Sequence, residues 1–384
     1  MAELPRRRAL RIVLQVLTSG ISTGIVCLLL EGGLRLFHPV PLHPTESFLA
    51  GGWKTGREGA MGHVPNAVGR VKRAEFDVAV RINSQGLRER EIPYEKPAGV
   101  YRILVLGDSQ TFGFGVEAEE AYARRLEGHL NPRVRGRAVQ RVETLNAGVI
   151  GTGTAHQLYY LSQEGWKYRP DAVVVGFFFN DVIENTQCRL YGLRGDRLVQ
   201  QARAAGRAAL IHEVEGRKKD AEDVQVYTAP EAVRAPEPPF LIRHSHLVRF
   251  VRERLSNIVQ SARRRKAEPQ APASQELGAR LFEELARQCR ERDVTLVVAL
   301  IPAPHQCKDA SLTGLQGKYG TLLRFLKPSA GSRIAVVDLL PELRQRGWAN
   351  HFFPLDGHLN RTGHALGARL LAPCLEKLDP RLTR

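Results

Sequence analysis

Five residues spread over the chain could together carry out nucleophilic attack on a carbonyl carbon. Ser109 offers a hydroxyl nucleophile, and His358 could take its proton as a general base. Asp356 could fix the tautomer of that histidine and stabilise its cation. A backbone N–H of the glycine-rich turn that contains Gly151 and the side-chain amide of Asn180 could donate to the oxyanion that forms when serine attacks.

The serine lies directly after a predicted strand. Ile103 to Leu106 is an apolar run ending on Gly107, typical of a strand buried on both faces of a parallel sheet. Asp108 and Ser109 follow at once, and a helix is predicted soon after. A serine at such a turn lies above the carboxyl edge of the sheet, where backbone N–H groups point at its target. The alternative is that Asp108 or Ser109 only caps a helix.

Strands alternate with helices along most of the chain. The predicted strands of the main sheet cover residues 101–107, 139–146, 172–179, 294–301 and 334–339. The predicted helices cover about 117–130, 153–165, 275–292, 312–327 and 361–377. This alternation predicts the α/β class with a mostly parallel, five-stranded sheet. Because active residues of such sheets lie on loops at the carboxyl ends of the strands, the five residues should meet at one edge.

Each cluster also has a purely structural interpretation. The glycine-rich turn at 148–153 could cradle a phosphate, but no lysine follows it as in a P-loop. Asn180 and Asp181 could form a turn or a helix cap. Asp356 could cap the last helix, and His358 could be a surface histidine. The clusters occur together and in order on successive strand ends, which favours the catalytic interpretation.

This order of clusters resembles the SGNH branch of the GDSL hydrolases, a family of serine esterases and acyl-transfer enzymes. Four sequence blocks of the family have counterparts here: Gly107-Asp108-Ser109 (first block), residues 146–151 (second), Asn180-Asp181 (third), and Asp356 with His358 (fifth). The resemblance covers about residues 100–380 apart from an insertion. It implies a flavodoxin-like, three-layer α/β/α fold.

The resemblance also implies a role for each of the five residues. Ser109 would be the nucleophile, and His358 and Asp356 would complete a catalytic triad. Ser109, Gly151 and Asn180 would form the oxyanion hole. No cofactor and no metal are implied.

The sequence departs from the family pattern at two points. Phe178 stands where the third block usually has a glycine, and Asp356 and His358 are two residues apart instead of three. The shorter spacing resembles that of membrane-anchored and glycan-O-acetylation members. His351 and His364 are the other nearby histidines, and we expect them to be loop or helix-surface residues.

An uncharged segment near the N-terminus predicts attachment to a membrane. Ile12 to Leu30 is 19 residues without a charge, long enough to cross a bilayer core. Four arginines precede it and should stay in the cytoplasm: Arg6, Arg7, Arg8 and Arg11. We therefore predict a single-pass membrane protein with its catalytic domain extracytoplasmic, which means periplasmic in a Gram-negative cell. The alternative is a cleaved secretory signal.

The chain is predicted to have three parts. Residues 1–35 form a cytoplasmic tip and transmembrane anchor, 36–99 a lead-in segment, and 100–384 the hydrolase domain. In the lead-in, an alternating stretch at 76–82 suits a strand. A helical insertion at about 185–274 interrupts the domain, and it could be a lid or substrate wall or a solvated excursion.

The composition of the chain limits the classes of molecule that it is expected to bind. The formal net charge is +16, yet no nucleic-acid-binding motif is present, so an acidic glycan or an anionic membrane face fits better than nucleic acid. The five cysteines form no CxxC pair, which argues against a metal site. Cys27 lies in the apolar segment, and any disulfide pairing among the other four stays open: Cys188, Cys289, Cys307 and Cys374.

The leading hypothesis is an extracytoplasmic serine esterase acting on acyl esters of envelope glycans or lipids. A second hypothesis keeps the same residues but passes the acyl group to an envelope polysaccharide, which makes the protein an O-acyltransferase. A third is a non-catalytic polysaccharide-binding protein on the same fold. The sequence identifies neither the acyl group, nor the alcohol, nor the oligomeric state.

Overall fold

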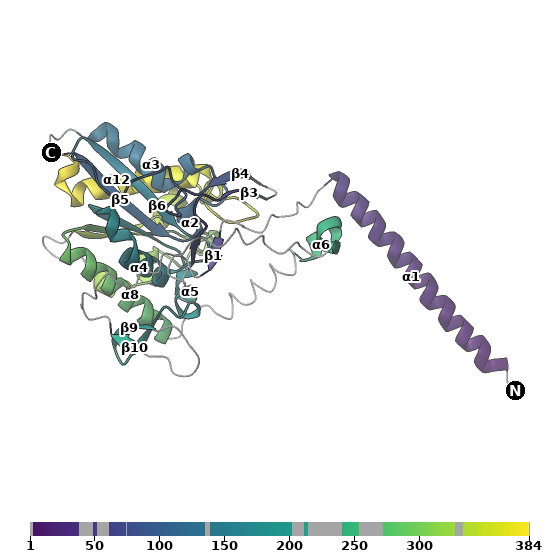
Figure 1. The fold of residues 1–384 in the computed structure, drawn as a ribbon. Coiled ribbons are helices and arrows are strands. Elements are labelled where there is room, and N and C mark those ends of the chain that lie inside the picture. The colour runs from purple at the N-terminus through teal and green to yellow at the C-terminus, as the bar shows by residue number, and fades with distance from the viewer. Residues whose placement is uncertain are drawn as a thin grey trace. The chain divides into compact units, whose positions relative to one another are not determined.

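The computed structural model describes residues 3–37, 49–51, 61–73, 75–134, 139–201, 211–213, 240–252, 272–326 and 333–383 (Figure 1). The chain divides into two compact units. One consists of residues 1–44 and 234–267, and the other of residues 45–233 and 268–384. The second unit contains the five residues singled out above.

A parallel five-stranded sheet forms the centre of the larger unit. Its strands are β5 (Val100–Gly107), β6 (Arg141–Gly148), β7 (Ala172–Phe177), β11 (Thr295–Leu300) and β12 (Ile334–Asp338). They lie in the order β12-β11-β7-β5-β6, with every neighbouring pair parallel. The five predicted strands are confirmed, and the order is that of flavodoxin-like sheets.

Helices cover both faces of the sheet and complete three layers (Figure 1). On one face α3 (Tyr122–Leu130) packs against α12 (Arg361–Leu378). On the other face α4 (Thr154–Gln163) packs against α8 (Pro272–Glu291), and α5 (Asp181–Gln187) contacts both. The predicted α/β/α arrangement is confirmed.

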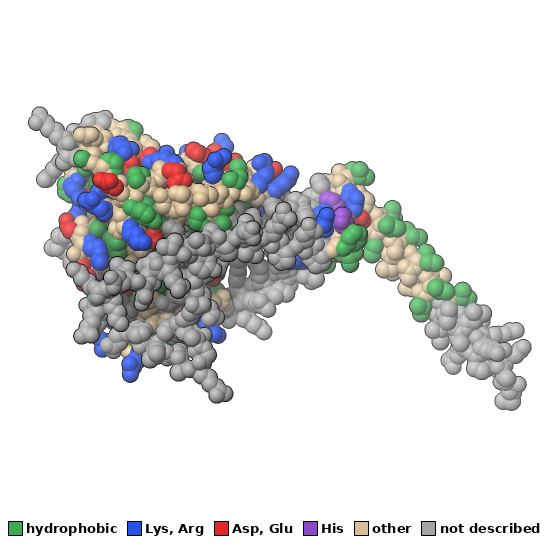
Figure 2. Space-filling model, in the orientation of Figure 1, with side chains coloured by type: hydrophobic (Ala, Val, Ile, Leu, Met, Phe, Trp, Pro, Cys, Tyr) green, Lys and Arg blue, Asp and Glu red, His purple; other side chains and the backbone are tan. Residues whose placement is uncertain are grey.

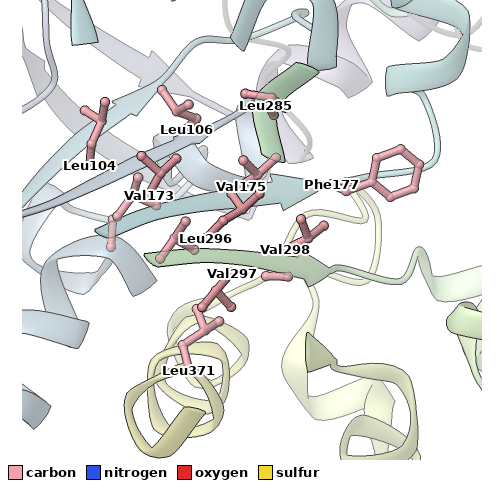
Figure 3. Close-up of a cluster of buried hydrophobic side chains, with 14 of the residues drawn as sticks. Leu104, Leu106, Val173, Val175, Phe177, Leu285, Leu296, Val297, Val298 and Leu371 are labelled. Carbon is pink, nitrogen blue, oxygen red and sulfur yellow. The ribbon is translucent and has the colours of Figure 1, made fainter. Parts of the chain in front are cut away.

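The core consists of apolar side chains on both faces of the strands (Figure 3). Val297 of β11 points toward Leu371 of α12, while Leu296 and Val298 point to the opposite face, on the side of Leu285 of α8. Successive side chains of a strand face opposite layers, so a strand covered on both faces must be apolar throughout. This is why the buried strands appear in the sequence as uninterrupted apolar runs.

One predicted helix was wrong. Residues 312–327 were expected to form a continuous helix, but the structure has only α10 (Leu315–Lys318) and a 3-10 turn at Arg324–Leu326. The stretch contains Gly314, Gly317 and Gly320. Glycine destabilises a helix interior by about 1 kcal/mol relative to alanine, and three of them within seven residues interrupt the helix here.

The insertion contains strands as well as the expected helix. After α5, the strands β8 (Tyr191–Arg194), β9 (Arg197–Gln201) and β10 (Ile211–Glu213) form an antiparallel sheet. A two-residue loop, Gly195-Asp196, joins the first two of these strands. The short helix α6 (Phe240–His244) and a further helical stretch at 246–252 belong to the smaller unit, together with α1 (Glu3–Phe37).

The lead-in segment contributes a hairpin to the larger unit. Its strands are β3 (Val68–Lys72) and β4 (Asp77–Arg81), the latter at the strand predicted for 76–82. Apolar residues of the hairpin form a cluster with two phenylalanines that follow the serine: Val71, Phe76, Val78, Val80, Ile82, Phe112 and Phe114. The remaining short elements are β1 (Leu49–Gly51), β2 (Met61–His63), α2 (Ser109–Phe112), α9 (Pro304–Lys308) and α11 (Leu340–Gln345).

A buried arginine joins the hairpin to the turn that carries Ser109. The Arg88 guanidinium is 1% exposed and donates to the carbonyl oxygens of Gly113 at 2.7 Å and Val116 at 2.8 Å. It also donates to the carbonyls of Phe112 and of Ala79 in β4. Burial lowers the pKa of Arg88 to about 10, so the side chain stays charged at neutral pH.

We predict that Arg88→Met will destabilise the protein by about 3 kcal/mol or more, because it leaves several buried carbonyl groups without a donor. Arg81→Met, on the exposed side of the same hairpin, is the matched control and should change stability by less than about 0.5 kcal/mol. Denaturant unfolding measures both. Equal stability of the two variants would show that Arg88 is not the joint between these segments.

Candidate active site

Three glycines that pair across neighbouring strands form the surface on which the turn with Ser109 packs. Gly107 ends β5 and pairs with Gly148 of β6 on one side and Gly176 of β7 on the other. A Cβ at Gly107 would lie 1.9 Å from the Thr111 hydroxyl, one at Gly148 would lie 2.3 Å from a backbone nitrogen of α2, and one at Gly176 would lie 2.4 Å from the Thr111 hydroxyl. Only a row without side chains lets α2 pack directly onto the strand ends.

The serine occupies the first position of α2, next to these three glycines. The preceding Asp108 caps the helix, because its carboxylate accepts from the backbone N–H of Gln110 at 2.9 Å. The cap is therefore Asp108, and Ser109 is left with its hydroxyl facing the loop before α12. The Ser109 side chain is largely buried, with 9% exposure.

The structure brings His358 and Asp356 to this serine. His358 Nε2 lies 2.8 Å from Ser109 Oγ, and His358 Nδ1 is hydrogen-bonded to Asp356 Oδ1. The backbone N–H of Leu359 donates to the Gln110 side chain at 3.1 Å, which ties the histidine loop to α2. The geometry is that of a nucleophile, a base and a group that orients the base.

The electrostatics of the pair suit that arrangement. Burial by itself would raise the pKa of Asp356, but the hydrogen bond from His358 and the histidine's positive charge outweigh it and lower that pKa below its usual value. Asp356 is therefore ionised at neutral pH and can stabilise a protonated His358. The ring of Phe114 lies 4.8 Å from the imidazole, centroid to centroid, and shields one side of it.

A residue of the lead-in supports the histidine loop. The Glu75 carboxylate accepts from the backbone N–H groups of Leu355 at 3.0 Å and Asp356 at 2.8 Å. The sequence contains no signal for this contact, because Glu75 lies some 280 positions earlier in a stretch without a motif.

The other two nearby histidines lie elsewhere. His364 is fully buried, so the expectation of a helix-surface residue was wrong, and its Nδ1 accepts from the backbone N–H of Tyr122 at 3.2 Å. Burial lowers the pKa of His364 to about 3. His351 is also buried and ends the 3-10 helix Trp348–His351, so the expectation of a loop or helix-surface residue was wrong here too. Its Nδ1 lies 3.2 Å from the carbonyl oxygen of Gly347. The cap of the last helix is Asn360, whose side chain accepts from two backbone N–H groups.

The two remaining candidates follow β6 and β7. Gly151 lies in the turn after β6 with φ +73°, and a Cβ there would meet open space. Asn180 precedes α5, and its side chain is close enough to the Asp108 carboxylate to oppose the rise in the pKa of that group. An amide nitrogen has two N–H donors, so one can hold this contact while the other serves an oxyanion. Phe178, at the family's glycine position, is buried and packs its ring edge-to-face against Phe179.

Two buried carboxyl groups lie behind the serine, and the sequence did not indicate that they interact. Asp108 and Asp181 are both fully buried, and Asp181 accepts from the Thr154 hydroxyl at 3.0 Å and the Gln157 amide at 3.2 Å. Burial raises the pKa of Asp108 to about 6. Burial and the charge of Asp108 raise the pKa of Asp181 well above its usual value.

The cysteines are free thiols. Cys188, Cys289 and Cys307 are buried, Cys374 is half-buried and Cys27 is exposed. Burial raises the pKa of Cys289 and of Cys307 to about 12, which makes both thiols unreactive at neutral pH. Within the described ranges no group of three or more His, Cys, Asp or Glu side chains could hold a metal ion.

The sequence was compared with known families and structures. The model of the GDSL-like lipase/acylhydrolase family matches residues 105–366, which include all five candidate residues. No curated protein matches.

Several solved structures align with the chain. The lipase/acylhydrolase from Enterococcus faecalis is 13% identical, with 72% of this chain and 96% of that chain covered and a TM-score of 0.39. The acetyl xylan esterase AlAXEase is 13% identical, with coverage of 71% and 99% and a TM-score of 0.40. TesA is 12% identical, with coverage of 72% and 99% and a TM-score of 0.39.

We predict that Asp181→Asn will stabilise the protein increasingly as the pH rises above about 4. The raised pKa means that the folded state keeps a proton that the unfolded state loses above about pH 4, so wild-type stability falls through this range. Asparagine keeps the acceptor for Thr154 and Gln157 but does not titrate. The melting temperature should exceed wild type by about 2–4 °C per kcal/mol recovered.

The control is Asp196→Asn, because that side chain is 82% exposed. Its melting temperature should follow wild type at every pH. A constant gap between Asp181→Asn and wild type from pH 5 to 8 would show that Asp181 does not hold a proton in the folded state.

Proposed function

Since the chain belongs to the GDSL-like lipase/acylhydrolase family and is an ester-hydrolysing enzyme, we propose that Ser109, His358 and Asp356 form its catalytic triad. The observation that carries the proposal is the 2.8 Å approach of His358 Nε2 to Ser109 Oγ, with Asp356 on the other ring nitrogen. These three side chains come from two loops at the carboxyl edge of one sheet. Their mutual contacts place a nucleophile beside a base and the base beside a carboxylate, as serine hydrolysis requires.

Hydrolysis proceeds in two steps. Ser109 Oγ attacks the ester carbonyl while its proton passes to His358 Nε2, and the imidazolium is stabilised by Asp356. The proton then goes to the departing alcohol, which leaves an acyl group on Ser109. Water attacks the acyl-enzyme with His358 again as the base, releasing the carboxylic acid and restoring the serine.

The oxyanion is held by N–H donors at the strand ends. The Ser109 N–H lies at the N-terminus of α2, and the Gly151 N–H and the Asn180 amide approach from the turns after β6 and β7.

We place the catalytic unit outside the cytoplasm. Residues Leu14–Phe37 of α1 are apolar and long enough to cross a membrane, a property that signal sequences share. The arginines before this segment favour an N-terminus that stays inside. In this proposal α1 is an uncleaved anchor and the substrate is an acyl ester of an envelope glycan or lipid.

Acyl transfer is a second candidate, favoured by one observation. The two-residue spacing of Asp356 and His358 resembles that of glycan-O-acetylation members. The same triad would then pass its acyl group to a sugar hydroxyl instead of water. A non-catalytic binding protein is disfavoured, because Ser109 and His358 are both present and in contact.

We predict that Ser109→Ala will lower the hydrolysis of p-nitrophenyl acetate by about 1,000-fold or more, because the oxyanion donors alone supply only a small part of the rate. The full chain in detergent is assayed at pH 8 under initial-rate conditions. The exposed Ser311→Ala is the matched control and should keep wild-type turnover. Wild-type activity in Ser109→Ala would end the serine-enzyme proposal.

Asp356→Asn should lower kcat by about 10,000-fold, because an amide favours the wrong tautomer of His358. The melting temperature should stay within about 2 °C of wild type, since the asparagine fills the same volume. Asp309→Asn, on an exposed loop, is the control for loss of a loop carboxylate. Near-wild-type kcat in Asp356→Asn would mean that Asp356 does not orient the histidine.

A further inference from the structure

We propose that residues 240–252 are a second membrane contact, an interfacial segment fastened to the end of α1 that lies on an anionic phospholipid surface. The proposal rests on the proposed role of α1 as a membrane anchor. It adds a binding surface that lies outside the catalytic unit.

A glutamate of α1 fastens the segment. The Glu31 carboxylate accepts from the backbone N–H groups of His246 at 3.0 Å and Leu247 at 2.8 Å, and from the Ser245 hydroxyl at 2.9 Å. These N–H groups begin the helical stretch 246–252, so Glu31 caps it from a position more than 200 residues earlier in the chain. A carboxylate at the end of an apolar helix is costly unless it is satisfied in this way.

An arginine one turn further along α1 also holds the segment. Arg35 donates to Glu31 at 2.6 Å and to the carbonyl oxygen of His244, the last residue of α6, at 2.6 Å. α6 and the stretch 246–252 are thus both bonded to the last turns of α1. Cleavage of α1 as a signal sequence would remove Glu31 and Arg35 together, so the contact requires α1 to remain on the chain.

Large apolar side chains on both partners face outward. Phe240 and Leu241 of α6 are 74% and 64% exposed, and Leu36 and Phe37 at the end of α1 are 77% and 86% exposed. Figure 2 shows apolar side chains along α1 and, at one end of it, basic and histidine side chains beside them. Insertion of these side chains into the boundary between head groups and acyl chains would explain why apolar residues are exposed at the end of a candidate membrane span.

The charges of the segment select the kind of surface. Residues 240–252 include three arginines and no acidic residue: Arg243, Arg249 and Arg252. Guanidinium groups pair with phosphate oxygens, and several of them beside exposed apolar side chains match an anionic phospholipid surface. A protein partner is the competing occupant, and the experiment below separates the two.

The experiment places a tryptophan at the proposed contact in the full chain. Leu241→Trp is reconstituted in nanodiscs of phosphatidylcholine with one quarter phosphatidylglycerol, with or without bromine on the acyl chains, and the emission of the parent protein is subtracted. We expect bromine to remove about half or more of the added emission, since an interfacial residue reaches the acyl boundary. Asp196→Trp, in the exposed β8–β9 loop, is the control and should lose little. Unquenched emission at position 241 overturns the proposal and is what a segment reserved for a protein partner would give.

Two further measurements test the contact made by Glu31 and the preference for anionic lipid. Glu31→Leu keeps α1 apolar but removes the acceptor, and should reduce the quenching at position 241 by about two-fold or more, whereas Glu31→Gln keeps an acceptor oxygen and should retain most of it. Discs without phosphatidylglycerol should also show weaker quenching. Undiminished quenching in Glu31→Leu would contradict the role of Glu31 in holding the segment. Equal quenching in both lipids would contradict a preference for anionic phospholipid.

The same discs distinguish this inference from the proposed function. Co-elution of the protein with the discs reports whether α1 anchors it, and hydrolysis of p-nitrophenyl acetate reports the triad. A protein that enters the discs and hydrolyses the ester, but whose Trp at position 241 is not quenched, contradicts the interfacial segment alone.

Discussion

The close approach of α2 to the strand ends is the constraint on which the site depends. Gly107, Gly148 and Gly176 lie side by side across three parallel strands, and a Cβ on any of them would collide with α2. The helix that begins with Ser109 therefore rests directly on the sheet. This fixes the height of the hydroxyl above the sheet edge, and the loops after β6, β7 and β12 are then arranged around it.

Buried polar groups hold this turn from below and from the side. Arg88 satisfies carbonyl groups where α2 ends, and Asp108 caps the same helix where it begins. Asp181 interacts with Asp108, and burial raises the pKa of Asp181 well above its usual value. Buried polar groups cost free energy unless they are paired or protonated, so the pairing and the protonation of these groups both contribute to the stability of the turn that carries Ser109. Catalytic geometry and pH-dependent stability are thus properties of the same few side chains.

The lead-in segment is part of the catalytic unit in physical terms. Its hairpin contributes apolar residues to the cluster around Phe112 and Phe114, and its Glu75 accepts from the loop that carries Asp356. Contacts of this kind orient a catalytic loop without touching the reacting atoms. The smaller unit uses the same principle, since Glu31 of α1 orders a segment from the distant insertion by accepting its backbone N–H groups.

Local pattern determined the strands and most of the helices and singled out Ser109, His358 and Asp356 as candidates, because apolar runs and the polar residues that end them are properties of neighbouring residues. The tertiary structure decided the rest. The choice of His358 over His351 and His364 depends on a contact across 249 positions, which follows from the order of strands in the sheet. The roles of Arg88 and Glu75 and the register of the three glycines depend in the same way on which segments the fold brings together. No local pattern carries that information, because the free energy of these contacts exists only once the segments are packed.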